Sequence, residues 1–274
     1  MKAAITVIKE QVKNFYLIKR LSAYEIKSQN RNNYLGMAWE VINPSIQILI
    51  YWFVFGTLRK RNEIDVAPND EVSFILWLLA GFILWIFFYQ ATIQSSKSIY
   101  SRLRMLSKMN FPMSIIPNYI IFSKFYIHVF MLVIIMIIFQ LSGEFVNIYY
   151  LQLIYFIFAT FCLTFAISLV TSTLSTIIRD VHMLLNSTLR MGLYLSGVLW
   201  PLSFLSEHEV IMNIMKLNPL YYLIEGYRAA LFGTDWFFIT HWHYTLVFWG
   251  LVIVLFIFGS ALHVKFRRHF IDYL

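Results

Sequence analysis

The sequence predicts an all-α membrane protein with six transmembrane helices. Of its 274 residues, 59% are apolar and 19% aromatic, and only 13% are charged, against about 25% in an average soluble protein. The mean hydropathy is +0.67. A water-soluble domain is excluded, because too few charged side chains are present to cover its surface.

Six apolar runs are long enough for transmembrane helices, since crossing a hydrocarbon core of about 30 Å takes about 20 mostly apolar residues. The runs are residues 42–58, 74–90, 125–141, 153–174, 183–202 and 244–264. We expect one domain over residues 1–274. It comprises a cytoplasmic interfacial region at 1–36, the six-span bundle at 37–264 and a cytoplasmic tail at 265–274.

The distribution of basic residues predicts that both termini are cytoplasmic. An even number of spans places the termini on one side, and 15 Lys and Arg flank the spans on that side, against five on the other. The basic cluster at 59–61 is a local exception, and it is balanced by acidic neighbours. We attribute the net charge of +8 to topology and not to nucleic-acid binding, because no basic low-complexity tail is present.

The N-terminal region predicts an amphipathic helix that lies in the membrane interface. Over residues 3–20, apolar side chains such as Ile5, Ile8 and Val12 fall on one helical face, and Lys9 and Lys13 fall on the other. The face either anchors the chain to the membrane surface or docks a partner.

A second amphipathic helix is predicted at 95–111, between the second and third spans. Ile99, Leu103 and Leu106 recur at helical spacing, with Arg102 and Arg104 beside them. Its pattern alone fits either anionic lipid headgroups or a cleft in a soluble partner.

Residues 210–217 and 220–231 predict a pair of short helices on the outer side, each too short to cross a bilayer and separated by Asn218-Pro219. We expect both to be half-inserted. Glu225 and Arg228 lie three residues apart and can share a face, which favours either a structural salt bridge or an outer gate.

Missing motifs exclude several functions. The chain has no GxxxxGK[ST] phosphate loop, no HExxH or GxSxG sequence and a single cysteine, Cys162, so we expect no catalytic site, no metal site and no cofactor. None of the six runs contains Asp or Glu, which disfavours a proton- or sodium-driven transporter.

A few polar side chains in or beside the apolar runs are candidates for a substrate pathway. A cation near the bilayer centre costs about 2.5 to 3.5 kcal/mol, so we expect Lys124, which borders the third span, and Arg190, in the fifth, to face a bundle interior or a wet cavity. Arg190 could instead snorkel to the cytoplasmic interface. Hydroxyl residues at i+4 spacing in the fourth span either pack helices or line a hydrophilic path. The candidates are Arg190, Lys124, Thr160, Thr164, Ser168 and the aromatic Tyr194.

Three sequence blocks resemble the permease subunits of ABC-type polysaccharide exporters. They are NYLGMAWEVINP at 33–44, RDV at 179–181 and NPLYYLIEGYR at 218–228. The resemblance covers nearly the whole chain, and it is greatest to the wall teichoic acid translocation permeases of Gram-positive bacteria. One departure is Gly197, where relatives often carry Pro, which makes the geometry of the fifth span less transferable.

The resemblance implies an ABC type-2 transmembrane domain that acts as a homodimer with two copies of a separate ATP-binding subunit. That subunit would bind ATP and Mg²⁺, in agreement with the missing phosphate loop. The helix at 95–111 would be the coupling helix that docks on it. Its expected contact residues are Ile99, Arg102, Leu103, Arg104 and Leu106.

The implied function is a permease that moves a lipid-diphosphate-linked teichoic acid polymer across the bacterial plasma membrane. Arg190 and Lys124 would then contact phosphate groups, because cations in a low-dielectric groove attract anions strongly. The alternatives are export of another polysaccharide or of a small hydrophobic solute by the same fold, and a six-span enzyme that acts on lipid phosphates.

Overall fold

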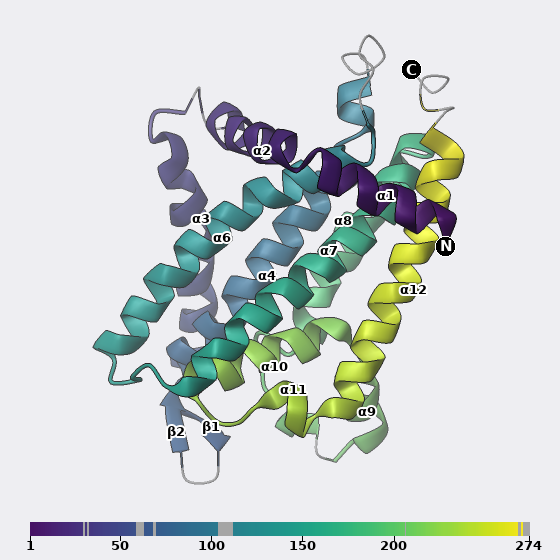
Figure 1. Cartoon of the computed structure of the whole chain (residues 1–274). Coiled ribbons are helices and arrows are strands. Elements are labelled where there is room, and N and C mark those ends of the chain that lie inside the picture. Colours follow the sequence, from purple (N-terminus) through teal and green to yellow (C-terminus); the bar gives the residue numbers. More distant parts are fainter. Residues whose placement is uncertain are drawn as a thin grey trace.

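The computed structural model describes residues 1–29, 31, 33–58, 63–67, 70–103, 112–205, 207–267 and 270. Long helices run side by side through the molecule (Figure 1). Helix α4 (Phe74–Ser96) is the most enclosed, with 83% of its apolar window buried inside the chain. It packs against α6 (Ile115–Leu141), α7 (Gln152–Ile177) and α10 (Pro219–Phe232). These helices form the core of the bundle.

Five helices of the described residues are long and apolar enough to cross a membrane. They are Gly36–Thr57, Phe74–Ser96, Ile115–Leu141, Ile148–Ile177 and Trp242–Phe266. The first of these includes α3 (Trp39–Tyr51) and the π-helical turn η2 (Trp52–Thr57), and the last is α12. They correspond to five of the six expected spans. Several extend well beyond the apolar runs, and α6 begins ten residues before the run at 125–141.

The fifth expected span, residues 183–202, is not confirmed as a membrane-crossing helix. Helix α8 (Asp180–Leu195) has 16 residues, which at 1.5 Å per residue gives about 24 Å, less than a hydrocarbon core. Gly197 follows with a φ of +71°, a left-handed conformation that suits glycine and ends the helix. The 3-10 turn η5 (Leu202–Leu205) comes after Pro201.

Helices α1 (Lys2–Lys13) and α2 (Phe15–Gln29) lie across one end of the bundle (Figure 1). The expected helix at 3–20 is therefore two helices, separated at Asn14. Glu10 of α1 pairs with Arg267 at the end of α12, with 2.6 Å between oxygen and nitrogen. This ion pair brings the two ends of the described chain to the same end of the molecule.

The opposite end carries the short elements. The antiparallel strands β1 (Glu63–Ala67) and β2 (Asp70–Ser73) form a hairpin that the sequence pattern did not predict. Helices α9 (Glu209–Lys216) and α10 form where the two short helices were expected, and α11 (Phe237–Thr240) follows. The Asn218 side chain caps α10 by accepting a hydrogen bond from the Leu220 N–H at 3.0 Å. The depth of this helix pair in a membrane stays a prediction.

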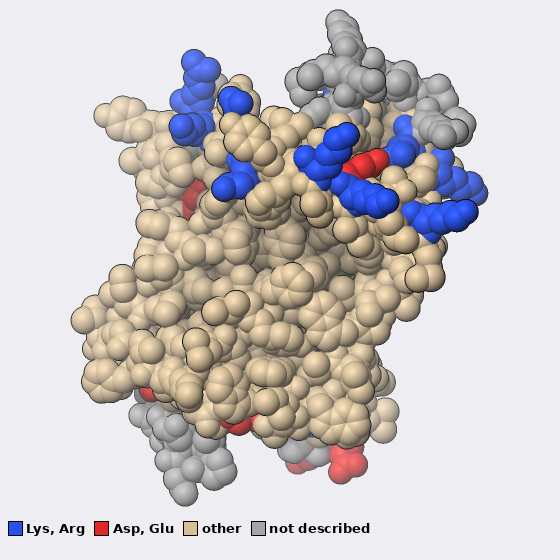
Figure 2. Space-filling view, in the orientation of Figure 1, with Lys and Arg blue, Asp and Glu red and all other residues tan. Residues whose placement is uncertain are grey.

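Charge separates along the molecule. On the face shown in Figure 2, Lys and Arg gather at the end that carries α1 and α2, with some Asp and Glu among them, and the charged side chains visible at the other end are Asp and Glu. The band between them shows neither sign of charge. Such a band fits the hydrocarbon core of a membrane.

Candidate functional site

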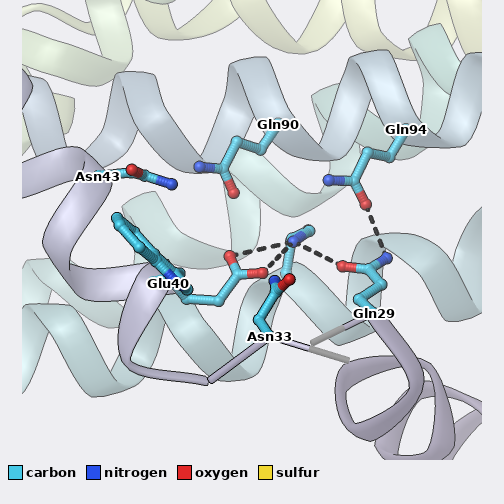
Figure 3. A pocket seen from close by; sticks show the side chains of 8 residues that line it. Gln29, Asn33, Glu40, Asn43, Gln90 and Gln94 are labelled. Atoms are coloured by element: carbon cyan, nitrogen blue, oxygen red, sulfur yellow. Dashed lines mark hydrogen bonds and ion pairs between the residues drawn. The ribbon is translucent and has the colours of Figure 1, made fainter. Parts of the chain in front are cut away.

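A polar cavity of about 700 Å³, which we call the amide cavity, opens where α2, α3, α4 and α6 meet near the basic end (Figure 3). Its lining residues are Gln29, Asn33, Trp39, Glu40, Asn43, Gln90, Gln94 and Lys124. Gln90 and Gln94 lie one turn apart on α4 and both point into it (Figure 3). Five of the eight side chains are uncharged amides.

Lys124 is the most enclosed residue of the amide cavity, with only 3% of its side chain exposed. Its ammonium donates to both carboxylate oxygens of Glu40, at 3.1 and 3.2 Å, and to the Gln29 side-chain oxygen at 3.0 Å (Figure 3). The early start of α6 places Lys124 inside a helix, and the partner Glu40 offsets the cost of burying its charge. Sequence reasoning missed this partner, because 84 residues separate the two.

A second, smaller pocket of about 320 Å³ lies between α3, α4 and α8, and we call it the aromatic pocket. Its lining residues are Gln47, Tyr51, Phe82, Trp85, Tyr89, Arg190, Leu193 and Tyr194. Arg190 and Tyr194 stand one helical turn apart on α8. No carboxylate of the described residues pairs with Arg190. The pocket therefore combines an available guanidinium with several aromatic rings.

The hydroxyl residues of α7 lie inside the bundle. Thr160 donates to the Phe156 carbonyl at 2.7 Å and Thr164 to the Thr160 carbonyl at 2.8 Å. Ser168 shares a hydrogen bond of 2.5 Å with Ser95 of α4. All three hydroxyl residues are fully buried, and they line neither the amide cavity nor the aromatic pocket. The Ser168–Ser95 contact joins α7 to α4, whereas the bonds of Thr160 and Thr164 lie within α7, and a part in the pathway stays a prediction.

The segment expected to be the coupling helix is only partly described. Helix α4 continues to Ser96 and the short turn η3 (Tyr100–Arg102) follows, while Arg104 and Leu106 lie outside the described residues. Ile99 and Leu103 are 0% and 3% exposed. They pack in a cluster with residues of α2 and α6. Their apolar face is thus covered by the chain itself and is not an open docking face.

Arg102 and His182 link this segment to other elements. Arg102 pairs with Glu25 of α2, with 2.7 Å between nitrogen and oxygen. Ser96, at the end of α4, shares a hydrogen bond of 2.7 Å with His182 Nδ1 in the first turn of α8. The Tyr100 ring also contacts the His182 ring edge-on at 6.3 Å between centroids. A movement of η3 would therefore reach α8, the helix that carries Arg190.

Arg228 of α10 is 2% exposed and joins three elements at the opposite end. Its guanidinium pairs with Glu225 at 2.6 Å and donates to the carbonyls of Gly197 and Val198 at 3.0 and 3.2 Å. It also lies 3.4 Å from the centroid of the Trp77 ring. These contacts fasten the turn after α8 to α10 and α4. A gating role for Glu225 and Arg228 stays a prediction.

Comparisons with known proteins agree with this architecture. A family model of the ABC-2 type transporter matches residues 16–232. The O-antigen export system permease protein RfbA of Myxococcus xanthus is 22% identical over 228 residues, which are 83% of this chain and 85% of the relative. The protein of the same name from Klebsiella pneumoniae is 24% identical over 263 residues, 95% of each. The chain belongs to the ABC-2 type transporter family.

Proposed function

We propose that this chain is the permease subunit of an ATP-driven exporter that moves a lipid-diphosphate-linked wall teichoic acid across the bacterial plasma membrane, with both termini cytoplasmic. Family membership supports the transporter role, and the relatives named as O-antigen export permeases support a polysaccharide as cargo. The aromatic pocket is the observation that supports a phosphate-bearing polymer as the cargo, rather than polysaccharides in general.

Arg190 is suited to bind an anion. It lies ten residues into α8 from Asp180, about 15 Å along the helix, and it has no carboxylate partner among the described residues. An unpaired guanidinium at this depth is costly next to lipid tails but attracts phosphate strongly in a low-dielectric groove. The rings of Tyr51, Trp85 and Tyr194 beside it offer flat faces for sugar rings.

A second copy of the chain would cover the open side of α3. Only 11% of the apolar window at Gly36–Thr57 is buried within the chain, and the polar side chains of Asn43 and Gln47 are exposed there. Polar side chains of a membrane helix usually face a bundle interior or a wet path rather than lipid. A homodimer with the pathway beside α3 and α8 meets this requirement.

The ATP-binding subunit, in two copies, would dock at the basic end. There η3 contacts α8 through His182. Because Ile99 and Leu103 are buried, we propose that they hold the segment around η3 in place against α2 and α6. More exposed side chains such as Arg102 would then contact the ATP-binding subunit. ATP and Mg²⁺ would be bound by that subunit.

Substitution of Arg190 tests the proposal. Arg190→Lys should keep part of the export and Arg190→Gln should lose most of it, because an ammonium replaces part of the guanidinium's attraction for phosphate. Surface polymer and folded protein are measured in the same cells. Arg179→Gln is the matched control, since Arg179 is an exposed arginine at the start of the same helix and lies outside the pocket.

The experiment also separates the alternatives. Normal export by Arg190→Gln at a normal protein level would refute phosphate contact. If the cargo in those cells is a neutral polysaccharide, that result supports the second candidate function, export of an uncharged glycan by the same fold. The amide cavity is the observation that favours this second candidate, because its charges cancel.

A further inference from the structure

We infer that the amide cavity binds a neutral sugar residue and selects it over a phosphate group. The inference rests on the proposed function for its physiological ligand, the exported glycan. The binding chemistry itself follows from the cavity.

The charge state of the cavity is the first argument. Among the described residues, Lys124 and Glu40 are the two charged ones that line the cavity, and they pair with each other. All three acceptors around the ammonium belong to the chain, two from Glu40 and one from Gln29. An incoming phosphate would have to displace Glu40 from the ammonium or lie beside its carboxylate, and both are unfavourable because the carboxylate repels an anion. The cavity thus resists anions.

The remaining polar groups suit hydroxyl ligands. A side-chain amide offers both donors and acceptors, which is what a sugar hydroxyl requires, since it donates one hydrogen bond and accepts others. Gln90 and Asn43 make no side-chain hydrogen bond with the part of the chain that the structure describes, and both face the cavity (Figure 3). Gln94 and Gln29 bond each other at 3.0 Å and keep further capacity.

Size and shape add a third argument. A volume of about 700 Å³ lies in the range of pockets that hold small molecules. Trp39 supplies one aromatic surface at the rim, with 36% of its area exposed, and the C–H face of a pyranose ring packs on such a surface. One indole with several convergent amides is a polar arrangement that a lipid tail would not fill.

Photoaffinity labelling tests the inference without ATP or transport. The full chain is placed in phosphatidylcholine nanodiscs and irradiated with decyl β-D-glucoside carrying a diazirine on the sugar. A second sample receives decyl phosphate with a diazirine next to the phosphate. Labelled residues are mapped by peptide mass spectrometry. We expect the glucoside to label the amide cavity and the phosphate to label the surroundings of Arg190.

Three variants complete the design. Gln90→Leu and Asn43→Leu should each reduce glucoside labelling of the cavity about fivefold, the effect of one net hydrogen bond. Gln140→Leu is the control, because Gln140 lies at the other end of α6 and should leave labelling unchanged. The inference is overturned if the phosphate probe labels the amide cavity as strongly as the glucoside, or if neither cavity variant lowers glucoside labelling.

The outcome is independent of the export assay. Glucoside labelling without glycan export in cells would contradict the proposed function and leave the site standing. Export without glucoside labelling would do the reverse.

Discussion

Replacing Arg228 with Met should destabilise the protein strongly, because the guanidinium of α10 contacts both α4 and the turn after α8. Breaking a buried ion pair from one side costs about 3 to 5 kcal/mol. Glu225 keeps 26% of its side chain exposed, so water recovers part of that cost and the lower limit applies. The buried carbonyls of Gly197 and Val198 also lose their donors, at about 1 kcal/mol each, the lower end of the cost of an unsatisfied buried group. We therefore expect a loss of about 5 kcal/mol.

The assay is unfolding by dodecyl sulfate in mixed micelles, followed by circular dichroism. Glu225→Gln in the Arg228→Met background removes the orphaned carboxylate, and the double variant should be about 2 kcal/mol more stable than the sum of the single changes predicts. Arg179→Met, at an exposed arginine, should change stability by less than about 0.5 kcal/mol. A coupling below about 0.5 kcal/mol between Arg228 and Glu225 would refute the reasoning.

Two further predictions concern the basic end. Ile99→Asp should lower the yield of folded protein as well as export, because an unpaired carboxylate would replace a fully buried side chain, whereas Ser101→Asp at an exposed position should fold normally. If Ile99→Asp folds normally and loses export, Ile99 instead belongs to an open face that docks on the ATP-binding subunit. Burial, followed by the positive charge of Lys97, lowers the pKa of His182 below its ordinary 6.5. The unfolded chain then takes up the proton more readily than the folded protein, so the stability that neutral His182 contributes is complete above about pH 6.5 and falls as the pH drops below it. His182→Asn should flatten this part of the pH dependence of the dodecyl sulfate midpoint, and an unchanged profile would contradict the assignment.

Helix positions could be predicted from the sequence where a single physical requirement decides them. The runs that became α4, α7 and α12 are long and apolar, and no other structure satisfies their backbone groups in a membrane. The start of α10 was equally readable, because Asn218 is a cap and Pro219 suits the first helical turn. Composition therefore determines most of the bundle.

The predicted helix boundaries were wrong where contacts or backbone conformation, rather than local hydropathy, set the end of a helix. Apolar runs end at charged residues, so the predicted third span stopped at Lys124, whereas Glu40 from α3 lets α6 begin at Ile115. The predicted fifth span passed through Gly197, whose positive φ ends α8 two residues earlier. Hydropathy windows contain neither the partner of a charge nor the sign of φ.

The candidate sites divide in the same way. Arg190 and Tyr194 were each singled out in the sequence, but their common pocket was not, because α3 and α4 supply the rest of its lining. The apolar spacing of Ile99 and Leu103 predicted a face that docks on lipid or on a partner, but periodicity does not say what covers such a face, and α2 and α6 do so here. The amide cavity was missed, because four separate segments supply its lining.

The two cavities are neighbours along the same helices, which has a consequence for a cargo that alternates sugar and phosphate. Asn43 lines the amide cavity and Gln47, one turn further along α3, lines the aromatic pocket, with a rise of about 6 Å between them. On α4, Gln90 lines the amide cavity and the adjacent Tyr89 lines the aromatic pocket. Under the proposed function, a neutral sugar in the first cavity would hold the next phosphate within reach of Arg190. An uncharged glycan would engage the amides and leave the guanidinium unused, so the balance between Gln90→Leu and Arg190→Gln in export measures how strongly the cargo is charged.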